Sequence, residues 1–440
     1  MLFRRYGTFS GGIDLPDEKQ LTRDQPIEPY RPRGAVRVPL APCRGRPAEP
    51  IVEPGQVVSA GEKIASATAG VDVFAPVAGT VRAFCQVRVA AEHVFSACPA
   101  VEIEPADQPF LPSDAREVFD WQAAGAAAVR ERIAAGGLST HRRPAEPLTE
   151  WIDRARSKRC LTLVANVMEG QPYVTADHRL LVEHGPQVLP GLAILGRAIE
   201  AQELILAAES RRTGDYQQLA EPGHTCHVER VALPHKYPIG ADPILVKVLT
   251  RREVPPGGSP MDVGCAVVDA ATCFAIYRWV VLGLPPTGRV VTVSGPRAAR
   301  TGNFFVPFGV SCAELLGEAE ALGVHNGPMV GLCWPDDAVV CPTTNAVLAM
   351  EPAPLAAPSQ CIRCAWCTDH CPARLNVAAL NDAFELGRLT QARRLVAPAC
   401  VECGVCSYVC PARLPLSQRV RQLKRTILDV ERSMPLFAGG

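Results

Sequence analysis

Apolar and polar positions repeat with two different periods along the chain. Strand-like apolar runs at 160–167 (CLTLVANV) and 203–210 (ELILAAES) flank a helical pattern at 177–199 that contains prolines. This alternation predicts an α/β domain over residues 115–250. Residues 289–350 return to short strands around a helical stretch at 312–323, which predicts a small mixed α+β domain. Residues 1–35 are polar and proline-rich, and we expect them to form an extended arm.

Residues 36–110 alternate brief apolar and polar runs, with glycine and proline between them. The segments VEPGQVVSAGEKIA (52–65) and FAPVAGTVRAF (74–84) place glycines where tight turns are expected. The pattern looks like a biotinyl- or lipoyl-type β-sandwich. Such carrier domains present a lysine at a hairpin tip, and no lysine lies between the two segments. A structural β-sandwich is therefore the prediction.

The composition is that of an ordinary globular protein. The chain has 440 residues, 48% of them hydrophobic, with 45 basic and 45 acidic residues. This neutral balance gives no support for nucleic-acid binding. The longest apolar stretch, 273–284, is too short to span a membrane and contains Arg278. With no apolar signal segment at the N-terminus, we expect a cytoplasmic protein without a membrane span of its own.

Eight of the 18 cysteines form two runs near the C-terminus, CIRCAWCTDHCP at 361–372 and CVECGVCSYVCP at 400–411. Both match C-x2-C-x2-C-x3-C-P, the pattern of bacterial two-cluster ferredoxins, in which the fourth cysteine ligates the other cluster. The runs therefore predict two [4Fe–4S] clusters. Their ligands are Cys361, Cys364, Cys367 and Cys410 for cluster 1, and Cys371, Cys400, Cys403 and Cys406 for cluster 2. The other cysteines are scattered singly and fit buried structural thiols.

Two other uses of these cysteines fit the pattern less well. Disulfide frameworks are typical of small secreted domains. Zinc sites usually pair two C-x2-C hairpins and have no need for a third and fourth cysteine in each run. The stretch between the runs, 375–399, has helical spacing that is able to support a cluster pair. We predict a 2x[4Fe-4S] ferredoxin-like domain at 361–425, joined by a proline-rich linker at 351–360.

Further motifs are spread over almost the whole chain: GGIDLPDEK (11–19), PYVTADHRLLVEH (172–184), KYPIGAD (236–242) and KVLTRREVPPGGSPMDVG (247–264). With these motifs and the cysteine runs, the chain resembles the C subunit of the Rnf complex, a membrane-associated ferredoxin:NAD+ oxidoreductase of bacteria. It is also similar to the related cobalamin reductase of propanediol-utilising microcompartments.

The resemblance implies a multidomain α+β fold. Its parts would be a barrel-sandwich hybrid at 36–110, an α/β domain similar to the NADH- and FMN-binding subunit of complex I at 115–250, a β-grasp domain of the SLBB type within 251–350, and the dicluster domain. It also implies FMN and NADH as cofactors. Membrane-embedded and ferredoxin-like subunits would be partners, ferredoxin or NADH would be electron donor or acceptor, and the location would be the inner face of the cell membrane.

The glycine-rich loop of this family, GxGGAGFPTxxK, holds FMN and NADH phosphates through its backbone N–H groups. Here it corresponds to RIAAGGLSTHRR (132–143), in which Arg132, Ala134 and Ala135 replace the first three glycines. The family's NGAECEPY becomes NVMEGQPY (166–173), with glutamine at an acidic position, and KYPxGxEKQL becomes KYPIGADPIL. The candidate cofactor contacts that the resemblance leaves are Gly136, Gly137, Thr140, Asn166 and Glu169.

These departures predict a changed nucleotide site; the alternative is sequence drift around a working site. The leading hypothesis is an electron-transfer subunit that passes single electrons through two clusters, as the peripheral C-type subunit of an Rnf-like complex. One alternative is a self-contained NADH-dependent flavin or cobalamin reductase. Another is an adaptor that feeds a different oxidoreductase. No catalytic side chain is predicted, and whether the chain is itself an enzyme stays open.

Overall fold

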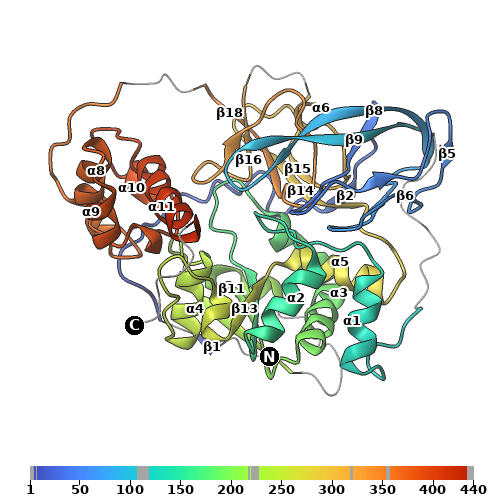
Figure 1. The fold of residues 1–440 in the computed structure, drawn as a ribbon, viewed down its shortest axis with the longest axis horizontal. Coiled ribbons are helices and arrows are strands. Elements are labelled where there is room, and N and C mark those ends of the chain that lie inside the picture. Colours follow the sequence, from blue (N-terminus) through green and yellow to red (C-terminus); the bar gives the residue numbers. More distant parts are fainter. Residues whose placement is uncertain are drawn as a thin grey trace.

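The computed structural model describes residues 4–5, 7–106, 118–216, 219, 227–317, 321–352 and 357–433. Within these residues the chain forms four sheets and a separate helical domain, which lies at one end of the molecule (Figure 1). This multidomain α+β architecture confirms the predicted fold class.

The β-sandwich consists of a four-stranded and a three-stranded sheet. The first has the order β3 (Val36–Pro39), β9 (Phe95–Pro105), β8 (Gly79–Ala90), β5 (Val57–Val58), and the second has β4 (Glu49–Pro50), β6 (Lys63–Ser66), β7 (Val73–Phe74). The paired strands β8 and β9 form a long hairpin, and the Ala91 N–H donates to the Val94 carbonyl at its tip, 2.9 Å away. This hairpin carries Glu92 and His93 toward the helical domain.

The α/β domain contains a parallel sheet in the order β1 (Arg4–Arg5), β12 (Val228–Leu233), β11 (Glu203–Glu209), β10 (Thr162–Val167), β13 (Cys265–Val268). Side chains alternate between its faces. Along β10, Leu163 packs toward α3 (Ala176–Ile199) and α5 (Ala270–Val280), whereas Val164 packs toward α4 (Asp242–Thr250). The helices α1 (Ala126–Ala134) and α2 (Leu148–Ser157) and the 3-10 segments at Ser210–Tyr216 and Pro260–Val263 complete the domain. The boundary expected at residue 250 falls inside this domain, because β13 and α5 follow it.

The region in which a β-grasp domain is predicted contains a mixed sheet, with the order β17 (Leu332–Cys333), β16 (Leu322–His325), β18 (Ala346–Met350), β14 (Gly288–Ser294), β15 (Gly302–Pro307), β2 (Ile27–Pro29). Strand β2 comes from the N-terminal arm and pairs with β15, so part of the arm belongs to this sheet. Helix α6 (Cys312–Leu316) is shorter than the helix predicted over 312–323, because Gly317 adopts a positive φ of 70° and ends it.

The helical domain contains α7 (Trp366–Asp369), α8 (Val377–Glu385), α9 (Leu389–Arg394), a 3-10 turn at Ala397–Ala399, α10 (Val405–Tyr408) and α11 (Leu416–Ser433). It has a core of its own, in which Leu380 of α8 packs with Val420 and Leu423 of α11. No helix in the described part of the chain has the length and apolar character that crossing a membrane requires.

Candidate iron–sulfur and nucleotide sites

The two cysteine runs share the same backbone conformation. The residue before the second cysteine of each run has a positive φ, 56° at Arg363 and 58° at Glu402. The residue after that cysteine also does, with 64° at Ala365 and 80° at Gly404. Left-handed backbone at non-glycine residues costs about 1–2 kcal/mol, so this turn is imposed by the fold. Turns of this kind direct successive N–H groups to one side and form anion-binding concavities, as at many iron–sulfur sites.

The eight thiols lie in two groups of four. Burial raises the pKa of Cys367, and the neighbouring thiols of Cys410, Cys361 and Cys364 raise it further. Burial likewise raises the pKa of Cys406, with further contributions from Cys400, Cys403 and Cys371. We refer to these sets as group 1 and group 2. Each group takes its fourth thiol from the other run, so their membership is that of the two predicted ligand sets, and the ligand assignment itself stays a prediction.

The chemistry of both groups suits iron–sulfur clusters. Four clustered thiols suit a positively charged iron centre, because iron binding holds thiols as thiolates. Backbone N–H groups already point at sulfur, from Leu375 to Cys371 Sγ and from Glu402 to Cys400 Sγ, each at 3.4 Å. Across the described ranges, no three His, Cys, Asp or Glu side chains converge as the ligands of a single metal ion do.

The two groups differ in exposure. Cys361 and Cys364 of group 1 are exposed, whereas all four thiols of group 2 are partly buried. Apolar side chains next to group 1 are also exposed, with Ile362 at 66%, Trp366 at 54% and Tyr408 at 58%. Group 1 is therefore the end of the domain that is accessible to another macromolecule, and group 2 faces the rest of the chain.

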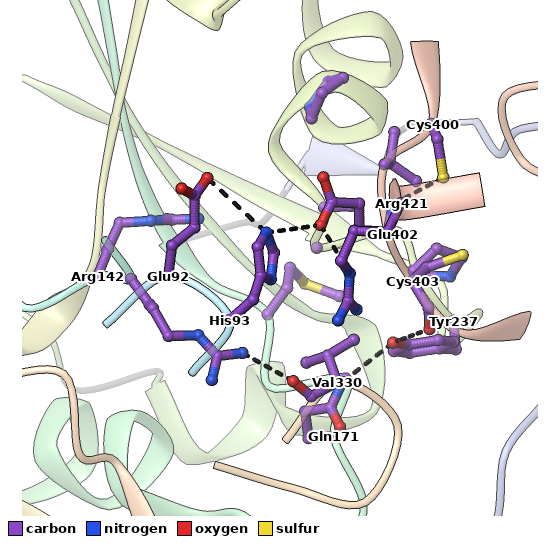
Figure 2. A pocket seen from close by; sticks show the side chains of 18 of the residues that line it. Glu92, His93, Arg142, Gln171, Tyr237, Val330, Cys400, Glu402, Cys403 and Arg421 are labelled. Carbon is purple, nitrogen blue, oxygen red and sulfur yellow. Dashed lines mark hydrogen bonds and ion pairs between the residues drawn. The ribbon is translucent and has the colours of Figure 1, made fainter. Parts of the chain in front are cut away.

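A cavity of about 440 Å³ lies between group 2 and the α/β domain (Figure 2). Its wall contains Cys400, Glu402 and Cys403 from the second run. The Glu402 carboxylate pairs with His93 Nε2 at the β8–β9 hairpin tip and with Arg421 Nε, both at 3.1 Å, and with Lys424 Nζ at 2.8 Å. Burial raises the pKa of Glu402, but Lys424 and His93 more than offset it, so the carboxylate stays ionised.

The GGID motif of the N-terminal arm contacts group 2 from another side. The Gly12 N–H donates to the His370 carbonyl at 2.8 Å, and a Cβ on Gly11 would lie 2.6 Å from the Cys371 carbonyl oxygen. Gly11 also has a positive φ of 72°. The arm can approach this cysteine only because the position has no side chain.

We expect Gly11→Ala to destabilise the protein by more than the ~1–2 kcal/mol cost of the left-handed backbone, because the new methyl group also meets the Cys371 carbonyl. Loss of iron from group 2 should accompany the lower unfolding temperature. Gly7→Ala is the matched control, since a Cβ there meets nothing within 4 Å. Equal unfolding temperatures for the two variants would contradict this role of the arm.

Three of the five candidate nucleotide contacts lie away from the cavities of the α/β domain. A Cβ on Gly136 would lie 2.3 Å from the Trp279 indole nitrogen, and one on Gly137 would lie 2.6 Å from the Asp72 carbonyl oxygen. Thr140 closes a local turn, in which its Oγ1 accepts from the Glu146 N–H at 3.1 Å. These positions pack the loop against α5 and the β-sandwich, so the glycines do not form an open phosphate cradle here.

The other two, Asn166 and Glu169, line a second cavity of about 270 Å³ at the carboxyl end of β10. Asn166 Nδ2 donates to the Gly240 carbonyl at 2.9 Å. The Glu169 carboxylate accepts from the backbone N–H groups of Asp177 at 2.8 Å and His178 at 3.1 Å, so it caps the start of α3. The structure thus brings Asn166 and Glu169 together but separates them from Gly136, Gly137 and Thr140.

The residues that line this second cavity include Arg142 and Arg143 of the degenerate loop and, not predicted from the sequence, Asp177, Asp269 and Arg289. Arg142 lines both cavities and pairs with Asp242 at the start of α4. Several buried polar atoms here have no hydrogen-bond partner: His141 Nδ1, Arg143 Nη1, Asp177 Oδ1, Asp269 Oδ2 and Asn345 Oδ1. Unsatisfied polar atoms in such number indicate a place for a polar ligand or water. The signal for this cavity in the sequence was the pair of arginines that ends the degenerate loop, Arg142 and Arg143.

Three family models match the chain: the RnfC barrel sandwich hybrid domain at 7–108, the Nuo51 FMN-binding domain at 147–278 and the 4Fe-4S dicluster domain at 353–411. These matches confirm the β-sandwich and the dicluster domain as predicted. They also support a domain of the flavin-binding type for the central α/β region.

Most of the chain also aligns with known proteins. It is 31% identical over 83% of its length to the C subunit of the ion-translocating oxidoreductase complex of Cronobacter sakazakii, of which it covers 48%. It is 28% identical over 85% of its length to the C subunit of the proton-translocating ferredoxin:NAD(+) oxidoreductase complex of Clostridium ljungdahlii, of which it covers 84%. A crystal structure of an NAD+-reducing [NiFe]-hydrogenase aligns with 73% of this chain and 59% of its own, with a TM-score of 0.45 and 16% identity.

The chain spans about half the length of some relatives, 48% of the Cronobacter sakazakii subunit and 51% of the C subunit of the ion-translocating oxidoreductase complex of Pseudomonas aeruginosa. The resemblance recognised from the motifs is confirmed by these alignments and by the RnfC domain match. Over most of its length, the chain is therefore similar to the C subunits of Rnf-type complexes.

Proposed function

We propose that the chain is a peripheral electron-transfer subunit of an Rnf-like membrane complex and passes single electrons through two [4Fe–4S] clusters. The observation that carries this proposal is the pair of four-thiol groups in one small domain, one exposed and one turned toward an internal cavity. The clusters, when bound, supply reversible one-electron redox chemistry. The protein would hold these clusters so that one lies at the exposed end of the domain and the other at the buried end, and electrons would enter and leave at different sites.

In this proposal, the exposed end around group 1 exchanges electrons with a partner. Ile362, Trp366 and Tyr408 give that end an apolar contact surface beside exposed thiols. Aromatic and apolar side chains at the centre of an interface supply most of its binding energy. The partners would be other subunits of the complex, membrane-embedded or ferredoxin-like. They would hold this chain at the inner face of the cell membrane.

The buried end around group 2 serves exchange within the chain. Its cavity is lined by the α/β domain, where the family's flavin and NADH site lies. Here Arg142, which lines both cavities, is held in an ion pair by Asp242, and Gly136 is covered by Trp279. These contacts favour an electron-transfer subunit with an altered nucleotide site. The unpaired polar atoms around Asp177 and Asp269 favour the second candidate, an NADH-linked flavin reductase with FMN in the smaller cavity.

The deciding experiment uses the intact chain, purified without oxygen. Iron, sulfide and extractable flavin are measured per chain, and NADH and then dithionite are added while visible absorbance is followed. We expect about eight irons, the sum for two [4Fe–4S] clusters, no bleaching by NADH and full bleaching by dithionite. Bound FMN with bleaching by NADH would select the reductase. An iron content well below about four would overturn both functions.

A further inference from the structure

A chain of three hydrogen bonds joins the α/β domain, the β-grasp domain and the loop of group 2. The Tyr237 hydroxyl donates to the Cys403 carbonyl oxygen at 2.6 Å, and Gln171 Nε2 donates to the Tyr237 oxygen at 3.0 Å. The Gln171 carbonyl oxygen in turn accepts from the Met329 N–H at 3.1 Å. Figure 2 shows Gln171 and Tyr237 beside Cys403 at the edge of the larger cavity. We call these three bonds the latch.

The direction of each bond is fixed by its partners. The Cys403 carbonyl can only accept, so the single hydroxyl proton of Tyr237 is used there. The Tyr237 oxygen must then accept its second bond, and the Met329 N–H needs an acceptor. A side chain at position 171 therefore has to donate with one atom and accept with another. An amide does both, whereas a carboxylate has no proton to donate and would compete with Cys403 for the hydroxyl.

We propose that Gln171, acting through Tyr237, is the positioning residue that holds the group 2 loop, residues 400–406, against the α/β domain. The chain carries glutamine where the family pattern has an acidic residue. The amide of Gln171 supplies the proton that the Tyr237 oxygen accepts while its hydroxyl donates to Cys403. The inference rests on the proposed cluster at group 2, since the loop it positions carries Cys400, Cys403 and Cys406.

The residues around the latch hold Tyr237 in the position in which its hydrogen bonds form. Tyr237 is 7% exposed and packs with Leu15 and Val405 in a small apolar core, with Met329 and Cys403 at its edge. Its backbone pairs with Ile13 of the arm through bonds of 2.9 and 3.0 Å. Because the Tyr237 side chain is buried, a hydrogen bond lost there leaves a partly desolvated polar group, which is costly.

The test compares Gln171→Glu, Gln171→Met, Tyr237→Phe and the double variant Gln171→Glu/Tyr237→Phe with the parent chain, all loaded with iron and counted first. The rate of hydrogen exchange of the backbone amides at 400–404 reports whether the latch hydrogen bonds hold this loop. Each single change should raise the exchange rate of these amides about fivefold, as expected for the loss of one net hydrogen bond. The double variant should not exceed the larger single effect, because both changes break the same chain of bonds.

Two further readouts separate positioning from general destabilisation or added charge. Electron paramagnetic resonance of the reduced protein should change for the cluster that is lost in Cys403→Ala and stay unchanged for the other. Gln171→Met should behave like Gln171→Glu, while Gln202→Glu, at an exposed position, should have no effect. Additive single effects, or exchange at 400–404 equal to that of the parent, would overturn the inference. Because iron is counted first, failure of the latch is distinguishable from failure of the cluster assignment.

Discussion

Cys403→Ala should remove about half of the iron from the anaerobically purified chain, because a [4Fe–4S] cluster needs four thiolate ligands. The group 2 thiols lie together, and negative charge on Cys400 and Cys371 would raise the pKa of Cys403. Alanine offers no replacement ligand at this partly buried position. We expect about four irons per chain, about half the visible absorbance that dithionite bleaches, and loss of most electron transfer.

The other domains should stay folded in this variant. The helical domain has its own apolar core, separate from the two cores of the α/β sheet. Far-ultraviolet circular dichroism and the unfolding of the remaining domains should therefore change little. Retention of about eight irons in Cys403→Ala would contradict the assignment of this cysteine as a ligand.

Cys371→Ala tests the crossed ligation most sharply. Cys371 stands in the first run of the sequence but lies with group 2, where negative charge on it would raise the pKa of Cys406. The cluster left in Cys371→Ala should therefore give the same spectrum as the one left in Cys403→Ala, and differ from the one left in Cys364→Ala. Cys160→Ala, which removes a buried thiol outside both groups, is the control and should retain all of the iron. Matching spectra for Cys371→Ala and Cys364→Ala would show that each run serves its own cluster.

The spacing of cysteines within each run was sufficient to predict the dicluster domain, since short-range spacing determines how such loops wrap a cluster. The helix across 177–199 was also predictable, and it is observed with a kink at His184, before Pro186. Contacts between distant segments were not predictable. His93, Tyr237 and Gly11 all meet the helical domain from positions at least 166 residues away along the chain, and no periodic pattern in a single sequence encodes such contacts.

The glycine loop shows why a motif alone can mislead. Gly137 matches the family pattern and Gly136 stands beside it, yet the structure uses their missing side chains to admit the Asp72 backbone and Trp279. A glycine is required wherever backbone approaches closely, whatever group approaches it. The presence of a glycine in a sequence therefore does not tell whether a phosphate group or a packed indole ring lies against it in the folded protein.

Asp177→Asn should stabilise the ligand-free protein at neutral pH. Burial raises the pKa of Asp177 well above its ordinary value, Asp269 and Glu169 raise it further, and Oδ1 has no hydrogen-bond partner. A raised folded pKa means that stability falls as pH increases from the unfolded pKa, ~3.9, to the folded one, and stays lower above it. Each unit of that increase corresponds to about 1.4 kcal/mol. Asparagine has a similar shape and carries no charge, so it avoids this loss.

The helix dipole opposes this gain only in part. Asp177 lies in the first turn of α3, where a negative charge gains about 0.3–1 kcal/mol. Denaturant unfolding at neutral and acidic pH measures the difference, and Asp153→Asn, at an exposed position of α2, is the control. The stabilisation should be present at neutral pH and should vanish as the parent carboxyl becomes protonated. A buried carboxyl that lowers stability is typical of a site kept for binding, so stabilisation by Asp177→Asn would point to a polar ligand in this cavity. Destabilisation at every pH would instead identify Asp177 as an ion-paired structural residue.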